Sequence, residues 1–355
     1  MQTRTYGELI DLIQSLIGAG TMTGDDYLKL SNFINRRYSE AYNTSPSWTR
    51  YIVSGEERWV SALNISGITS TNADLINGDY RVYGTTTSAG SFPAAEGAKA
   101  YVPVDRDAGE DPSFIIFKNS SNKWVWRSTG FTKDRATDVV TFTTGSGVTM
   151  VTQQDTEDRA SPLDVLDWGT LSSETGTFIL TSSQRVNYKE DFDFYSTSDS
   201  AVQKENIGEF IRIHRRKPFV NNSSIEYDFS VDIEGANILN IANTEDNTAF
   251  VTYKKELTLF TVAVSDPPVA ADFVDGGTVN GAANRALKVP LEFFYYLAHA
   301  SYADFLRMES KYEDARTEEA IAQGYLATEL EKIDVRNNNN SLNKKFSTYV
   351  NRQSR

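Results

Sequence analysis

The chain holds few side chains that could carry out a reaction. Its two histidines, His214 and His299, stand far apart in the sequence without a third ligand type beside either, so they do not predict a metal site. There is no cysteine, which excludes disulfides, thiolate metal sites and cysteine nucleophiles. No nucleophile elbow, Walker loop or dinucleotide-binding glycine pattern occurs. The sequence therefore predicts a protein that is not an enzyme and has no cofactor or metal.

Three clusters could instead bind a ligand. The acidic stretch 105–111 could wrap Ca²⁺, but its spacing is not that of an EF-hand, which favours a solvated loop. Trp124 and Trp126 lie two residues apart, hence on one face of a strand, where they either stack on a sugar or anchor the core; the core is favoured. A basic cluster could grip phosphate or pair with acidic neighbours, and pairing is favoured: Arg212, Arg215, Arg216 and Lys217.

The elements that must position these groups begin with two helices. Apolar residues recur at helical spacing from Leu9 to Ile17, and Gly18 ends the run. Thr23 then opens a capping box in which Asp26 replaces the usual glutamate, and one apolar face follows from Tyr27 to Ala41. The sequence thus predicts a first helical segment over residues 1–53.

The middle of the chain is rich in short strands. Between residues 54 and 184, β-branched and aromatic runs alternate with turn residues such as Asn77-Gly78, which predicts an inserted antiparallel sandwich or barrel. Residues 185–289 form a second, smaller β region that joins the body. Because carboxylates occur throughout, a hydrolytic carboxylate pair hidden in these strands stays open.

The longest helical pattern covers residues 290–334. An unbroken helix of this length would span roughly 67 Å, and we expect a break near Ser310 or Gly324. Its apolar stripe must pack on something, and the N-terminal helices are the natural partner. The fold class is therefore α+β, with a discontinuous helical bundle formed by the two ends of the chain around the β insertion.

The last residues, 335–355, form a basic segment without a carboxylate, predicted to be an extended arm. The whole chain carries a net charge of -13, which argues against general adhesion to nucleic acid. No apolar run approaches the roughly 20 residues needed to span a bilayer, and the N-terminus does not resemble a signal peptide. These features predict a soluble protein.

Several stretches resemble the head-to-tail adaptors of tailed bacteriophages, of the tail tubular or gatekeeper type. They are L-x-x-F-I-N-R-R-Y (Leu30–Tyr38), V-T-Y-K (Val251–Lys254), V-P-L-E-F-F-Y-Y-L-A-H-A-S-Y-A-D-F-L (Val289–Leu306) and E-D-A-R-x-E-E-A (Glu313–Ala320). The likeness covers about half of the chain. Adaptors of this kind are typically shorter and lack so large a β insertion, which leaves the role of the insertion open.

The resemblance implies a structural virion protein in the neck, made in the host bacterial cytoplasm. It implies a ring of twelve subunits that joins the portal to a downstream tail or nozzle protein and extends the DNA channel, with DNA passing through unbound. Neighbouring subunits would pack along a helix stripe: Phe294, Ala298, Phe305 and Tyr312. The arm would dock on the portal through its basic and apolar residues: Arg336, Lys344, Lys345, Phe346, Tyr349, Arg352 and Arg355.

Two other functions stay open at this point. One is a virion protein that binds host glycan through the β module, and the other is a hydrolase that uses a carboxylate pair. Binding of glycans by residues 54–183, or turnover lost with a single carboxylate, would distinguish them from the adaptor.

Overall fold

The chain folds into two compact units in the computed structural model. The helical unit consists of Met1–Ile52 and Leu257–Arg355, and the β unit is Val53–Glu256. The structure describes residues 2–18, 22–71, 73–90, 94–104, 114–128, 131–134, 137, 139–142, 148–189, 204–218, 225–239, 247–274 and 279–353. Within these ranges, side chains are not described for residues 75, 89–90, 132–134, 279 and 335–353.

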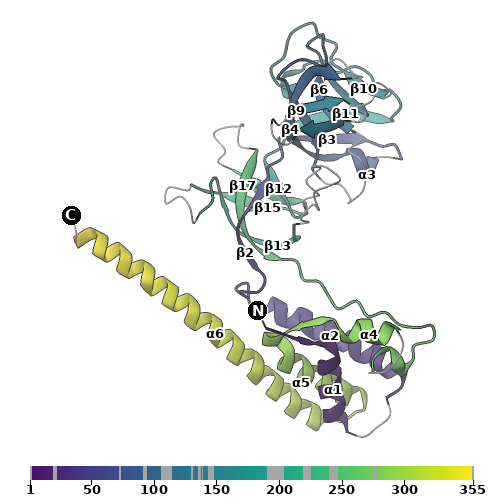
Figure 1. The fold of residues 1–355 in the computed structure, drawn as a ribbon, viewed down its shortest axis with the longest axis vertical. Coiled ribbons are helices and arrows are strands. Elements are labelled where there is room, and N and C mark those ends of the chain that lie inside the picture. The colour runs from purple at the N-terminus through teal and green to yellow at the C-terminus, as the bar shows by residue number, and fades with distance from the viewer. Residues whose placement is uncertain are drawn as a thin grey trace. The chain divides into compact units, whose positions relative to one another are not determined.

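The helical unit is built from the two ends of the chain (Figure 1). Strands β1 (Thr3–Thr5) and β18 (Lys288–Pro290) pair antiparallel and hold the N-terminus beside the start of α5. A short 3₁₀ turn, η2 (Ala270–Asp272), packs against α4. The described helices of this unit are α1 (Tyr6–Ile17), α2 (Gly24–Asn43), α4 (Val279–Arg285), α5 (Leu291–Met308) and α6 (Tyr312–Gln353).

Local capping explains where the first two helices begin. Thr5 accepts a hydrogen bond from the Glu8 amide at 3.2 Å, and the Glu8 carboxylate accepts one from the Thr5 amide. Thr23 and Asp26 repeat the arrangement at the start of α2, as the sequence predicts. These bonds satisfy backbone donors that a helix leaves free at its N-terminus.

Removing the Thr23 side chain tests whether the capping box stabilises the start of α2. Thr23→Ala is expected to lower the free energy of unfolding by about 1 kcal/mol, because the Asp26 amide at the start of α2 loses the hydroxyl that accepts its hydrogen bond. Urea denaturation followed by helical circular dichroism measures the change. Thr317→Ala, at an exposed threonine inside α6, is the matched control and should change it by less than about 0.5 kcal/mol. Equal effects of the two variants would contradict the role of the cap.

Aromatic side chains fill the core of the helical unit. The Phe293 ring on α5 meets Trp48 edge-on at 4.6 Å and Tyr38 at 5.8 Å, and Tyr38 stacks on Phe260 at 4.8 Å. The Asn35 side chain donates to the Phe260 carbonyl and accepts from its amide, both at 2.9 Å, which fastens the returning chain to α2. Segments more than 200 residues apart in sequence therefore form one core.

The β unit contains one large sheet, which curves like a barrel. Its strand order is β10-β7-β6-β5-β4-β3-β11, with β9 paired to β4 and β8 to β9. Successive side chains of a strand point to opposite faces of a sheet. In β6, Phe114 and Ile116 belong to one hydrophobic cluster and Ile115 and Phe117 to another, so both faces of the sheet are buried there. The strands are β3 (Leu63–Ile68), β4 (Gly78–Gly90), β5 (Lys99–Pro103), β6 (Phe114–Lys118), β7 (Trp124–Ser128), β8 (Phe131–Asp134), β9 (Val139–Phe142), β10 (Val148–Thr152) and β11 (Gly176–Ser182).

Two smaller sheets complete the β unit, in the orders β14-β13-β17-β2 and β12-β16-β15. They share one core that includes Ile213, Val251 and Tyr253. Two short helical turns, α3 (Ala73–Ile76) and η1 (Pro162–Asp164), lie in the loops. The remaining strands are β2 (Ile52–Trp59), β12 (Arg185–Asn187), β13 (Ile207–His214), β14 (Glu226–Tyr227), β15 (Phe229–Val231), β16 (Gly235–Ile238) and β17 (Thr248–Lys255).

The α+β fold class is confirmed, with N- and C-terminal helices packed together around an inserted, mainly antiparallel sheet and smaller sheets. One pairing differs from the expectation of an antiparallel module, because β4 and β9 run parallel. The structure also divides the region predicted at 185–289: residues through Glu256 belong to the β unit, and residues from Leu257 belong to the helical unit.

Candidate functional site

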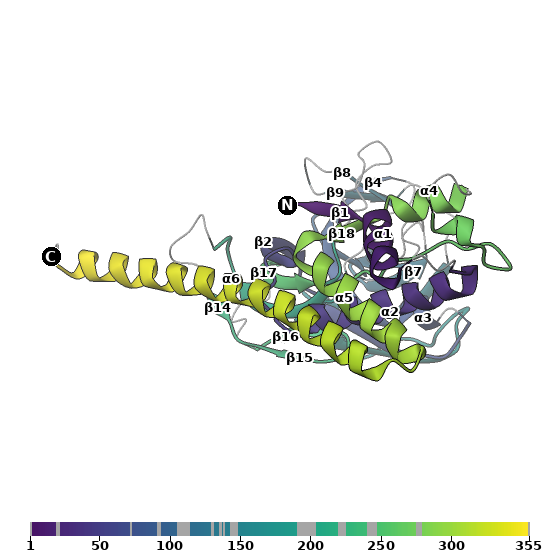
Figure 2. The ribbon, with the colours of Figure 1, turned by 90° about the horizontal axis from the view of Figure 1, so that it is seen from below.

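Helices α5 and α6 form a hairpin whose turn lies at residues 309–311. Ser310 has a φ of 64°, a conformation that few non-glycine residues adopt, and it follows the last turn of α5. Helix α6 then runs back along α5, side by side with it in two views (Figures 1 and 2). The break predicted near Ser310 is confirmed, whereas α6 passes through Gly324 without interruption.

The hairpin buries most of the predicted inter-subunit stripe. Phe294, Ala298 and Phe305 are almost completely buried inside the subunit, and Tyr312 is 63% exposed beyond the turn. Because the chain reverses at Ser310, the stripe does not continue from α5 onto α6 as one surface. The prediction is therefore corrected: three of its four side chains contribute to the interior and cannot meet a neighbouring subunit.

A network of ion pairs joins α2, α5 and α6 at the centre of the unit. The Asp304 carboxylate, only 3% exposed, accepts two hydrogen bonds from Arg37, each 2.7 Å long, and pairs also with Arg36 and Arg307. Glu319 on α6 binds Arg37 at 2.7 Å and Arg307 at 3.0 Å. Two carboxylates thus hold three helices through shared guanidinium groups.

The charges of this network stabilise one another. Burial by itself would raise the pKa of the Asp304 carboxyl, but hydrogen bonds and positive charge from Arg37 and Arg36 outweigh burial and lower it. Burial acts in the opposite sense on the pKa of Arg37, which Asp304 and Glu319 nevertheless raise. Both groups therefore stay ionised, and the network of ion pairs holds α2, α5 and α6 together.

The outer side of the hairpin carries exposed aromatic rings. Tyr295 and Tyr325 are 39% and 42% exposed and stack on each other with centroids 5.4 Å apart. The His299 ring stacks on Tyr325 at 5.4 Å, and its Nδ1 lies 2.7 Å from Glu318 Oε2. Ile321, 40% exposed, stands one turn before Tyr325 on α6. We call these four residues, Tyr295, His299, Ile321 and Tyr325, the aromatic patch.

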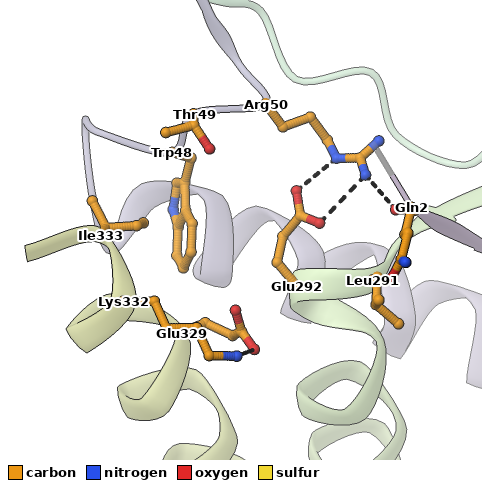
Figure 3. A pocket seen from close by; sticks show the side chains of 9 residues that line it. All are labelled: Gln2, Trp48, Thr49, Arg50, Leu291, Glu292, Glu329, Lys332 and Ile333. Atoms are coloured by element: carbon orange, nitrogen blue, oxygen red, sulfur yellow. Dashed lines mark hydrogen bonds and ion pairs between the residues drawn. The ribbon is translucent and has the colours of Figure 1, made fainter. Parts of the chain in front are cut away.

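A groove of about 350 Å³ opens where α6 passes the segment after α2 (Figure 3). The Arg50 guanidinium donates to the Glu292 carboxylate at 2.6 Å and to the Gln2 carbonyl at 2.6 Å, as the dashed lines of Figure 3 show. Across the groove, Lys332 pairs with Glu329 at 2.6 Å. The four charged side chains of the groove are thus paired with one another.

The distal part of α6 differs from the predicted extended arm. The backbone remains helical through Gln353, which makes α6 more than twice as long as α5. The last buried side chain described on α6 is Ile333. The side chains of the predicted docking residues lie outside the described residues: Arg336, Lys344, Lys345, Phe346, Tyr349, Arg352 and Arg355.

The structure places the other sequence candidates in supporting roles. Trp124 and Trp126 are 1% and 0% exposed, which confirms the interpretation as core residues. Arg212 lies 3.8 Å from Glu226, as expected for a strand end that pairs with acidic neighbours. The predicted acidic loop at 105–111 lies outside the described residues.

His214 ends β13 in the β unit, and His299 belongs to the aromatic patch of the helical unit. A search of the described residues finds no group of three or more metal-ligating side chains. Within the same residues, no helix has the length and apolar content to cross a membrane.

Comparisons of the chain with protein-family models, with curated proteins and with solved structures find no match. The aromatic patch and the ion-pair network therefore have to be interpreted from their own chemistry.

Sequence reasoning missed the aromatic patch, although a signal for it exists. Tyr295 and His299 stand four residues apart, as do Ile321 and Tyr325, so each pair shares one helix face. The face of α5 and the face of α6 come together only through the hairpin turn, and the sequence does not determine how α6 packs against α5. The network was missed for the same reason, because Arg37, Asp304 and Glu319 come from three separate segments.

Proposed function

We propose that this chain is a structural subunit of the neck of a tailed bacteriophage, which assembles into a ring between the portal and the tail and extends the DNA channel. The observation that carries the proposal is the ion-pair network. Arg37, Asp304 and Glu319 lie in three of the stretches that resemble head-to-tail adaptors, and the fold joins them at one point. A shared interior of this kind supports a common architecture for the helical body.

The aromatic patch supports assembly through the outside of that body. Exposed tyrosines are enriched in protein interfaces, where they combine apolar area with a hydroxyl group. Tyr295 and Tyr325 already stack on each other, so little side-chain freedom is lost when a neighbour covers them. In the proposed ring, the aromatic patch replaces the buried stripe as the surface that meets the next subunit.

Length and charge favour the same role. Residues 334–353 of α6 would extend roughly 30 Å as a helix, enough to reach a second protein. They carry basic residues, whereas the rest of the chain is strongly acidic. In the proposal the distal helix docks on the portal, and an acidic body allows DNA to pass without specific binding.

Removing the aromatic patch tests the ring. The double variant Tyr295→Ser/Tyr325→Ser is expected to shift the protein from a large oligomer to a monomer in sedimentation velocity, alone or on portal, because the interface loses its two largest apolar groups. Leu259→Ser/Met308→Ser, at two exposed apolar residues of the helical unit outside the aromatic patch, is the matched control and should assemble normally. A wild-type chain that stays monomeric with every virion component would contradict the proposal.

A further inference from the structure

A cavity of the β unit lies between the large sheet and the connections to the smaller sheets. Its volume is about 510 Å³, within the roughly 300–1,000 Å³ range of small-molecule sites. Tyr101 on β5 and Trp124 on β7 line it, with ring centroids 6.0 Å apart. Asp164 of η1 and Asn247, which precedes β17, line it as well. The cavity therefore combines aromatic surface with polar groups drawn from distant parts of the unit.

Some polar groups of this cavity are already used by the fold. Ser61 and Ser183 hydrogen-bond each other at 2.7 Å, and Ser183 also donates to Asp79. Lys118 is paired with Asp158. These side chains hold the cavity wall in place and are not needed for a ligand.

Other polar groups of the cavity have no hydrogen-bonding partner among the residues that the structure describes. Among the described residues, four lining side chains form no hydrogen bond or ion pair with the protein: Lys99, Tyr101, Gln184 and Asn247. Burial, and secondarily the charge of Asp164, raise the pKa of Tyr101 to about 12, so its hydroxyl stays protonated and can donate. One Asp164 oxygen accepts from the Ser161 amide, which leaves the other oxygen as an acceptor. The unused set thus contains donors, an acceptor and groups that do both.

This set excludes several ligand classes. An apolar ligand would displace water from these groups without replacing its hydrogen bonds, which is costly. A phosphate would meet the Asp164 carboxylate, with Lys99 as the one lining cation that has no described partner. A metal ion would find a single carboxylate in the wall. A neutral molecule rich in hydroxyl groups, with a C–H face for the aromatic wall, fits every feature.

We infer that this cavity binds a neutral saccharide unit of a glycan, with its hydroxyl groups bonded to Tyr101, Asn247 and Asp164 and its C–H face against the Tyr101 side of the aromatic wall. Each sugar hydroxyl both donates and accepts, which matches the mixed set of unused groups. Trp124 contributes as part of a buried wall and not as an exposed stacking platform. The inference rests on the β unit alone and holds whether or not the helical unit forms a ring.

Saccharide titration of the full-length protein tests the inference. Glucose, galactose, mannose, N-acetylglucosamine, N-acetylgalactosamine and their disaccharides are the probes, measured by saturation-transfer NMR and calorimetry. At least one is expected to bind with a Kd in the millimolar range or tighter. Tyr101→Phe removes only the hydroxyl and should weaken that Kd about tenfold, and Asn247→Ala should weaken it similarly. Tyr312→Phe, on the exposed surface of α6, is the matched control and should bind as wild type does.

Three results would overturn the inference. They are no binding by any probe, binding that both cavity variants leave unchanged, and competition by inorganic phosphate or hexanol at equal concentration. Because Tyr101→Phe and Asn247→Ala alter different parts of the wall, one of them remains informative if the other fails to fold. The thermal midpoint of each variant shows whether its fold is intact.

Discussion

Asp304→Ala is expected to lower the free energy of unfolding of the helical unit by about 3–5 kcal/mol. The substitution removes the carboxylate that binds Arg37 twice and that also pairs with Arg36 and Arg307. Arg37 is only 8% exposed and would keep a buried positive charge without its main partner. Urea denaturation monitored by helical circular dichroism measures the loss, and the β unit should unfold as before.

The same carboxylate predicts a pH dependence. The folded-state pKa of Asp304 lies below its unfolded value, so its contribution to stability is fully present above the unfolded pKa of about 3.9 and is lost as the pH falls through the folded pKa. In wild-type protein this loss is expected below about pH 4. Asp304→Ala should flatten that part of the stability curve.

Glu309→Ala is the matched control, because that carboxylate is 38% exposed and pairs only with Lys311 among the described residues. It should change the free energy of unfolding by less than about 1 kcal/mol. If Asp304→Ala and Glu309→Ala destabilise the protein equally, the network does not hold the three helices together.

The ends of the helices were predictable from sequence because local chemistry sets them. The capping box at Thr23 and the apolar repeat from Tyr27 to Ala41 specify α2 without reference to the rest of the chain. A break near Ser310 or Gly324 could be predicted from the length of the helical pattern, but the sequence did not decide between the two positions. The geometry of the break could not be predicted, because a reversal depends on which surfaces the two helices bury against each other.

The reversal of the chain between α5 and α6 determines which side chains are exposed on the surface of the hairpin. On a straight helix Phe294 and Tyr312 would share one face, and the hairpin instead buries Phe294 and exposes Tyr312. The tyrosines that do remain outside, Tyr295 and Tyr325, are 30 residues apart and meet only after folding. Asp304 appears in the sequence as one polar residue in an apolar run with Arg307 three residues later, and its partners Arg36 and Arg37 become apparent only when α2 lies beside α5.

The cavity wall of the β unit was unpredictable for a related reason. Tyr101, Asp164 and Asn247 come from three separate strands and loops, without a common spacing. Strand alternation did place Trp124 and Trp126 on one face, and the separate interpretation of that face as core is confirmed. Alternation alone cannot identify which residues of other strands complete a cavity.

Deleting residues 337–355 is expected to abolish attachment to the portal while leaving the body of the protein folded. The last buried side chain described on α6 is Ile333, so the deletion removes no described part of the hydrophobic core. The free energy of unfolding should change by less than about 0.5 kcal/mol. Co-sedimentation with a candidate portal protein measures attachment, and circular dichroism measures the fold.

A charge variant separates two ways in which the distal helix could bind. Lys344→Gln/Lys345→Gln keeps Phe346 and Tyr349, so a mainly apolar contact would survive it, whereas contact with an acidic portal surface would weaken and lose its salt dependence. Because the helix continues to Gln353 in the free subunit, docking costs less ordering entropy than an extended arm would require. Normal attachment of the truncated protein would show that the portal is held by the body, with the aromatic patch as the surface to test next.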